Sequence, residues 1–215
     1  MDIYEAMKTL RAVRRLRPDP IPDEVLERVL QAATWAPTGG NAQPWRVVVV
    51  RDRELMASLG ELYAARWLAY SKLHMKQIAG APEAVQASAR KMLGAGDHLA
   101  EHFATTPALF VFCFNPRLMA LTDAEQERPS IVGGASVYPA VQNLLLACRV
   151  EGLGCVLTTL LCQDEPRVRE LLSIPDPWYT AAAVPVGRPV LGGHGPITRR
   201  PVARMAFADR WGEAF

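Results

Sequence analysis

A turn-forming segment followed directly by an apolar strand constrains the fold more than any other part of this sequence. The segment Trp35–Trp45 reads WAPTGGNAQPW, and four consecutive valines, Val47 to Val50, follow it closely. Pro37 cannot lie inside a helix, and Gly39-Gly40 permits backbone angles that other residues avoid, so the chain must turn here. Four valines in a row are typical of a strand buried on both faces, as in a parallel sheet, where ligands commonly bind at a strand end. We therefore predict either a ligand-binding loop at the end of a sheet or an ordinary connecting loop, which uses the same residue types.

The composition predicts one compact domain over residues 1–215 that acts on a small molecule. Half of the 215 residues are hydrophobic, which is enough for a single well-filled core. There are 24 lysines and arginines against 22 aspartates and glutamates, and this net charge of +2 is too balanced for a dedicated nucleic-acid or membrane surface. No run of residues has the length of a signal-peptide core or of a membrane-spanning helix, so we expect a cytoplasmic protein.

The cysteines indicate a reduced interior rather than a disulfide framework. Cys113, Cys148, Cys155 and Cys162 lie in apolar segments and show no CxxC spacing. Cysteines in such surroundings behave as small core residues, so we expect no disulfide bond.

Hydrophobic periodicity, with proline, glycine and capping residues, predicts a succession of helices and strands. Apolar residues at helical spacing predict helices over 2–16, 22–35, 52–67, 133–151 and 164–172, with Asp52 and Asp164 as N-caps. Short apolar runs between turn residues predict strands over 47–50, 108–114, 155–161 and 181–186. Residues 62–96 predict a variable helical cover, which is either a lid over a site or a surface insertion without a role in binding.

Positive charge is densest at the end of the first predicted helix, where Arg11, Arg14, Arg15 and Arg17 gather. One interpretation is a solvated cluster that the helix dipole stabilises. The other is that Arg11 and Arg14, one helical turn apart, lie on one face and hold a phosphate.

A second pattern, His98-Leu-Ala-Glu101-His102, matches the H-x-x-E-H helix of zinc peptidases, in which two histidines bind the metal and a glutamate acts as base. No convincing third ligand follows in the sequence, and the flanking residues do not indicate peptide hydrolysis. An exposed helix face is the ordinary interpretation of these three residues.

The tail over residues 188–215 ends in an apolar segment that contains Met205, Phe207 and Trp211. Such a segment must cover something, either its own subunit or a neighbouring one. Aromatic residues at this density favour an arm that lies on a second subunit.

Four motifs in matching order resemble the flavin-dependent nitroreductase family over nearly the whole chain. Leu10-Arg-Ala-Val-Arg14 resembles the family's opening R-S-x-R segment, and Ala36–Trp45 resembles its P-S/T-G-x-N-x-Q-P-W loop. Gly152–Thr159 is similar to the G-L-G-x-x-x-T-T strand, and Pro185–Gly187 with Arg199-Arg200-Pro201 is similar to the closing segments. Ala12 departs from the family's usual serine, and Leu16 from its usual phenylalanine; a lost neutral hydrogen bond is worth about 1 kcal/mol, so neither change should abolish cofactor binding.

The resemblance implies an α+β fold, a three-layer sandwich with a mainly antiparallel central sheet flanked by helices, in place of the parallel sheet that the valines suggest. It also implies an intertwined homodimer with FMN at each interface, where the loop residues would come from the second copy. No dinucleotide-binding G-x-G-x-x-G motif is present, which favours FMN over FAD. The cofactor-binding residues that the resemblance implies are Arg11, Ala12, Val13, Arg14, Thr38, Gly39, Asn41, Gln43, Leu157, Thr158, Thr159, Arg199 and Arg200.

The reaction implied is transfer of electrons from NADPH or NADH, through the flavin, to a small oxidised acceptor such as a nitroaromatic compound or a quinone, with no catalytic side chain. Three alternatives stay open. Reductive dehalogenation occurs in the family, but its substrate-clamping Glu, Tyr and Lys have no clear match, since Arg66, Tyr70 and Lys72 stand at other spacings. A non-catalytic flavin-binding dimer and a zinc hydrolase that uses His98, Glu101 and His102 are the others.

Overall fold

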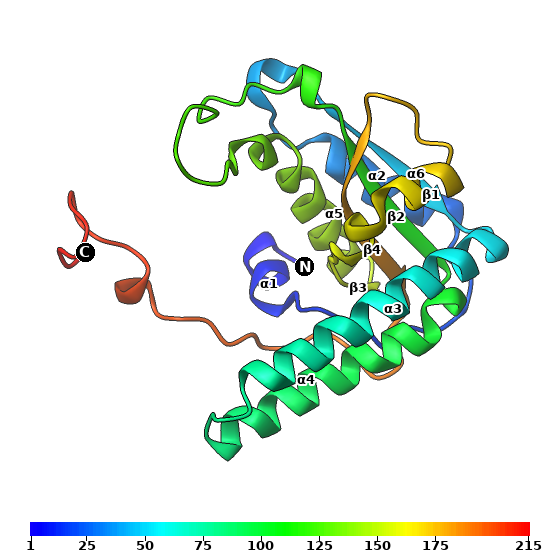
Figure 1. The fold of residues 1–215 in the computed structure, drawn as a ribbon, viewed down its shortest axis with the longest axis horizontal. Coiled ribbons are helices and arrows are strands. Elements are labelled where there is room, and N and C mark those ends of the chain that lie inside the picture. Colours follow the sequence, from blue (N-terminus) through cyan, green and yellow to red (C-terminus); the bar gives the residue numbers. More distant parts are fainter.

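A four-stranded antiparallel sheet lies between two helical layers in the computed structural model, which describes residues 1–215 (Figure 1). The strands are β1 (Trp45–Val50), β2 (Ala108–Phe114), β3 (Gly154–Cys155) and β4 (Tyr179–Gly187), in the spatial order β1-β2-β4-β3. All three neighbouring pairs are antiparallel, so the α+β sandwich is confirmed and the parallel sheet suggested by the valines is wrong. The α-helices are α1 (Ile3–Thr9), α2 (Asp23–Thr34), α3 (Arg53–Gln77), α4 (Glu83–His102), α5 (Tyr138–Val150) and α6 (Glu165–Leu171).

The central strand β2 divides the interior into two cores because successive side chains of a strand point to opposite faces. Phe110 and Phe112 are fully buried in the core that contains residues of α2 and α5. Leu109 and Val111 belong to the core that contains residues of α3 and α4. Both faces of β2 are therefore covered, which explains its uninterrupted apolar sequence.

The valine strand β1 is an edge strand, so the expectation of full burial on both faces is wrong. It pairs only with β2, and Val47, Val48 and Val49 are half-buried. Only Val50, at its end, is fully buried. The valines reflect the strand preference of β-branched residues at a partly covered position rather than a central place in the sheet.

The first helix ends at Thr9 rather than at residue 16, because the chain beyond it is held extended by tertiary hydrogen bonds. Val13 N donates to Cys155 O at 2.9 Å, and Arg17 N donates to Arg188 O at 2.7 Å. Arg15 O accepts from Val190 N at 3.1 Å. These bonds offset the helical pattern of the sequence, and Arg11 and Arg14 therefore do not share a helix face.

The predicted strand over 155–161 is also wrong in extent. Regular pairing ends at Cys155, and a single bridge from Thr158 to Ala183 follows before the chain turns into a 3₁₀ helix at Leu160–Asp164. Asp164 occupies the N-cap position of α6, but its side chain forms no capping hydrogen bond. Its carboxylate accepts from Arg66 on α3 instead.

The helical part of the cover predicted over 62–96 is confirmed. Helix α3 continues to Gln77, beyond the predicted end, and α4 returns alongside it as an antiparallel hairpin that projects past the sheet (Figure 1). Asp52 caps α3 as predicted, since its side chain accepts from Glu54 N and Leu55 N at 3.0 and 2.9 Å.

The end of the chain leaves the folded body as an arm (Figure 1). Trp211 and Phe215 are 91% and 83% exposed. Phe207 packs only on Trp211 among the aromatic side chains, with ring centroids 4.9 Å apart. None of the helices combines the length and the apolar character needed to cross a membrane.

Candidate functional site

A cavity of about 220 Å³ lies where the extended N-terminal segment, the helical hairpin and the end of the predicted threonine strand meet. Arg14 comes from the N-terminal segment, and Thr158 and Thr159 come from the turn after β3. The opposite wall is aromatic and apolar: it consists of Tyr63, Trp67 and Tyr70 from α3 and Met92 from α4. The structure thus brings together four of the predicted site residues: Arg14, Leu157, Thr158 and Thr159.

The sheet holds Thr158 in place through its backbone. Thr158 N donates to Ala183 O at 2.9 Å, and Ala183 N donates to Thr158 O at 2.8 Å. Its hydroxyl accepts from Leu160 N at 3.3 Å, which tightens the turn after it. The next residue, Thr159, is exposed, so its hydroxyl is available to a ligand.

Arg14 carries a guanidinium that forms no ion pair with any carboxylate of the chain. Burial raises the pKa of the nearby Tyr63 phenol. The positive charge of Arg14 and the hydrogen bond with the Thr158 hydroxyl both act to lower that pKa. An unpaired arginine against aromatic side chains is suited to an anionic or hydrogen-bond-accepting ring.

Tyr63, Trp67 and Met92 are functional candidates that the sequence alone did not single out. Three aromatic residues recur at helical spacing on α3: Tyr63, Trp67 and Tyr70. From the sequence they belong either to the buried face of the predicted helix over 52–67 or to the cover over 62–96. Only the extension of α3 beyond residue 67, with α4 folded against it, shows that this stripe lines a cavity.

Arg11 does not line the cavity, and its guanidinium lies near the start of the arm. A side chain at Gly195 would come within 3.9 Å of Arg11 Nη1. Beside it lies His194, another residue that sequence reasoning missed, whose Nε2 bonds to Leu153 O at 2.8 Å while its buried Nδ1 has no partner. Burial lowers the pKa of His194, and the positive charges of Arg149 and Arg11 lower it further, against the hydrogen bond to Leu153, which raises it.

Ala12 and Val13 differ in their surroundings. Ala12 is exposed, whereas Val13 is 5% exposed and packs against Gly154, where a Cβ atom would lie 2.7 Å from Val13 Cγ1. Val13 therefore fixes the path of the segment that carries Arg11 and Arg14.

The loop over residues 38–43 is ordered by its own hydrogen bonds but does not line the cavity. Gln43 N donates to Thr38 Oγ1 at 3.0 Å, and Gln43 Nε2 donates to Asn41 Oδ1 at 3.1 Å. Gly39 N donates to Ser136 Oγ at 3.1 Å, which ties the loop to the approach to α5. Asn41 and Gln43 have φ angles of 55° and 47°, a conformation uncommon for residues other than glycine, and such strain is often found at binding sites.

The two arginines near the chain end are not brought to the cavity either. Arg199 and Arg200 are exposed on the arm, and Arg199 Nη1 donates only to Thr198 O, at 2.8 Å. Their predicted contact with a cofactor phosphate stays a prediction.

A larger, mainly apolar cavity of about 470 Å³ adjoins the first one at Thr159. Its walls come from the end of β2 at Phe114, from Met119 and Ile131 in the following connection, and from Tyr138 on α5. The connection between β2 and α5 folds back on itself because Asp123 accepts hydrogen bonds from Ser130 Oγ and Arg128 Nη1. Apolar residues of this connection thereby line the cavity.

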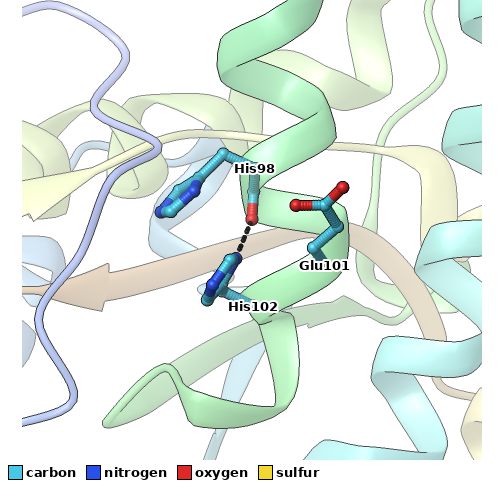
Figure 2. Close-up of side chains that lie close together, drawn as sticks. All are labelled: His98, Glu101 and His102. Atoms are coloured by element: carbon cyan, nitrogen blue, oxygen red, sulfur yellow. Dashed lines mark hydrogen bonds between the residues drawn. The ribbon is translucent and has the colours of Figure 1, made fainter.

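The H-x-x-E-H pattern lies on the last turns of α4 (Figure 2). The potential ligand atoms of His98, Glu101 and His102 all lie within 4.8 Å of one another. His98 Nδ1 faces Arg15 Nη1 at 3.4 Å, so this face of α4 lies against the N-terminal segment.

None of the cysteines is disulfide-bonded, which confirms the prediction of free thiols. Cys162 alone is half-buried and the other three are buried. Burial raises the pKa of Cys113 to about 11, so this thiol is not an activated nucleophile.

The fold and this site define an α+β sandwich with a basic, aromatic-walled ligand cavity at the junction of sheet and helical hairpin. The chain belongs to the nitroreductase family, whose model matches residues 7–188. An NADH dehydrogenase of Thermus thermophilus is 31% identical over 212 residues, with 96% of each chain covered. A 5,6-dimethylbenzimidazole synthase of Rhodobacter capsulatus is 28% identical over 218 residues, covering 97% of this chain and 94% of that one.

Solved structures show the same fold. An iodotyrosine deiodinase bound to FMN and 3-iodo-L-tyrosine matches with a TM-score of 0.67 at 23% identity, covering 98% of this chain and 99% of that one. The family and the sandwich fold predicted from the sequence are thereby confirmed.

Proposed function

We propose that this protein is an FMN-dependent oxidoreductase that passes electrons from NADPH or NADH to a small oxidised acceptor, such as a nitroaromatic compound or a quinone. The observation that supports this most directly is the cavity at Arg14. An unpaired guanidinium and two threonines there face an aromatic wall, a donor set that fits a planar ring with hydrogen-bond acceptors along one edge. FMN, when bound, supplies hydride chemistry, which agrees with the lack of an activated nucleophile among the cavity residues.

Arg14 and residues 157–159 would hold the ring, and Arg11, Ala12, Val13, Arg199 and Arg200 would hold the phosphate. Because Arg199 and Arg200 lie on an exposed arm, they would reach the phosphate only when the arm is placed against a second copy. Their guanidinium groups form no ion pair in the chain and are free for a dianion.

We also propose that the protein is a homodimer. The loop with Thr38, Gly39, Asn41 and Gln43 is ordered but remote from the Arg14 cavity, so it would complete the cavity of a second copy. The arm over 188–215 supports the same arrangement, since Trp211 is 91% exposed and has no cover in its own chain.

The electron donor and the electron acceptor would bind at this cavity one after the other. If both bind against the same face of the ring, the oxidised nicotinamide would leave before the acceptor enters. Tyr63, Trp67 and Met92 would exclude water from that face, while the Arg14 charge would favour electron-rich ligands.

Reductive dehalogenation is the second candidate, favoured by the likeness to the deiodinase structure. The side chains nearest to its amino-acid clamp are differently placed here. Arg66 is held by Asp164, with Nε–Oδ2 at 2.7 Å, and Lys72 lies in the groove between α3 and α4 with Asp97. Only Tyr70 lines the cavity, so an amino-acid substrate would lack a charged clamp.

An absorbance spectrum of the purified protein, followed by anaerobic addition of NADPH and then NADH, tests the proposal. Flavin bands that bleach with either donor and return with a nitroaromatic compound support it. Yellow protein that neither donor reduces indicates the non-catalytic dimer, and iodide release from 3-iodo-L-tyrosine after chemical reduction indicates the dehalogenase. A colourless protein that does not take up added FMN rejects all three. Light scattering after size-exclusion chromatography measures the dimer separately.

A further inference from the structure

Two imidazoles and a carboxylate lie together on the last turns of α4 (Figure 2). His98, Glu101 and His102 occupy positions i, i+3 and i+4, which are neighbours on a helix surface. Their potential ligand atoms lie within 4.8 Å of one another. A tetrahedral zinc ion with bonds of about 2.0–2.1 Å needs its ligand atoms about 3.3 Å apart, so small side-chain rotations would bring these groups to a metal.

A hydrogen bond within the cluster already orients one of the imidazoles. His102 Nδ1 lies 2.9 Å from the carbonyl oxygen of His98, as Figure 2 shows. Because a carbonyl only accepts, Nδ1 carries the hydrogen, and the Nε2 lone pair of His102 is left free. Histidines that bind metals usually donate their other ring nitrogen to a carbonyl or carboxylate in this way, which fixes the ring and the tautomer.

The surroundings leave room for solvent to complete the coordination. Glu101 and His102 are exposed and His98 is half-buried. The two rings are stacked with centroids 4.1 Å apart, so both nitrogen donors are on the same side of the helix. Three protein ligands with an open fourth position are common for zinc, and imidazole with carboxylate suits zinc, nickel or copper.

Arg15 is the one group that opposes a cation here. Its Nη1 lies 3.4 Å from His98 Nδ1, and because a guanidinium only donates, this nitrogen of His98 must be the acceptor. A metal bound through either nitrogen of His98 would repel Arg15 and require it to move. Removal of the Arg15 charge should therefore strengthen metal binding.

We propose that His98, Glu101 and His102 form a binding site for a divalent transition-metal cation such as Zn²⁺, with solvent as the remaining ligand and Arg15 as a competing cation. All three protein ligands come from the last turns of α4, and the metal would lie beside the N-terminal segment that carries Arg15. It does not depend on the proposed reductase activity, and its geometry requires no hydrolytic role for Glu101.

The test measures zinc bound per chain by equilibrium dialysis, using untagged full-length protein loaded with FMN and first treated with EDTA. We expect one zinc ion per chain at micromolar zinc. His98→Ala and His102→Ala should each weaken the affinity at least about tenfold, and Arg15→Gln should strengthen it. His74→Ala on α3, where the ring stacks on Tyr70, is the matched control and should leave the affinity unchanged.

Cobalt provides a second readout that needs no variant, because Co²⁺ in a tetrahedral site with imidazole ligands has strong visible bands that solvated Co²⁺ lacks. Absence of bound zinc in the wild-type protein would overturn the proposal. So would a zinc ratio that is the same in the His98→Ala/His102→Ala double variant, provided that circular dichroism shows an intact fold. Zinc binding is measured without turnover, so a failed reductase assay and a failed metal assay remain distinguishable.

Discussion

Replacement of Gly96 by alanine tests whether Trp67 is held as rigidly as the structure indicates. A Cβ atom at Gly96 would lie 1.9 Å from Trp67 Cζ2 and 2.1 Å from Cη2, far inside van der Waals contact. The indole cannot simply swing away, because it is 6% exposed and its Nε1 donates to Asp97 Oδ1 at 2.7 Å. Gly96→Ala should therefore displace Trp67 and deform the wall of the Arg14 cavity.

The expected loss of stability follows from three effects. Overpacking a core contact costs about 1–3 kcal/mol. Loss of the hydrogen bond to Asp97 costs about 1.5 kcal/mol, at the low end for a charged partner because that carboxylate is exposed and regains water. The better helix propensity of alanine returns about 1 kcal/mol, which leaves a net destabilisation of roughly 1.5–3.5 kcal/mol.

Gly94 supplies the matched control, since a Cβ atom there meets nothing within 4 Å. Gly94→Ala in the same helix should stabilise the protein by up to about 1 kcal/mol. Urea denaturation followed by circular dichroism compares the two variants, and in a Trp67→Phe background, which lacks the clashing indole atoms, Gly96→Ala should be far less harmful. Equal stability of Gly96→Ala and Gly94→Ala would refute the reasoning.

Three further outcomes are expected. Arg14→Ala should weaken FMN binding roughly 10- to 150-fold, measured by flavin fluorescence, whereas Arg17→Ala, which removes an arginine already paired with Asp19, should not. Asp52→Ala should lower the free energy of unfolding by about 1 kcal/mol through loss of the α3 cap, with an unchanged urea m-value. The hydrogen bond from Ser130 holds the pKa of Asp123 below its ordinary value of 3.8, so this carboxylate stabilises the fold above pH 3.8 and its contribution is lost as pH falls through the lower folded-state pKa. The difference in urea midpoint between Asp123→Asn and the wild type should accordingly vanish at low pH, and a constant difference would contradict this.

The elements with strong local patterns were predictable from the sequence. Helix α2 begins after Pro22 and ends before Pro37, and β2 coincides with the apolar run at 108–114. The errors occur where tertiary hydrogen bonds override a local pattern. Residues 10–16 have helical periodicity, yet the backbone of Cys155 takes the Val13 N–H, and this choice depends on residues more than a hundred positions away.

The site was predictable only in part for the same reason. Arg14, Thr158 and Thr159 were indicated by their motifs, and they do meet at one cavity. The aromatic wall was not foreseen because the pattern on α3 does not reveal which neighbour covers it. The positions of Arg199 and Arg200 depend on where the arm lies, and a single chain does not determine that.

The extended conformation of residues 10–17 places Arg14 at the cavity and Arg15 at α4, and it also allows the backbone bonds to β3 and to the arm. In an extended chain neighbouring side chains point to opposite sides, so Arg14 can face the cavity while Arg15 reaches His98 on α4. The same backbone bonds to β3 at Cys155 and to the start of the arm at residue 190. A helix over this segment would turn Arg14 and Arg15 only about 100° apart and would break both backbone connections. The departure from helical structure after Thr9 is therefore a requirement of the site, and substitutions that favour helix there should weaken ligand binding even where they spare every side chain in the cavity.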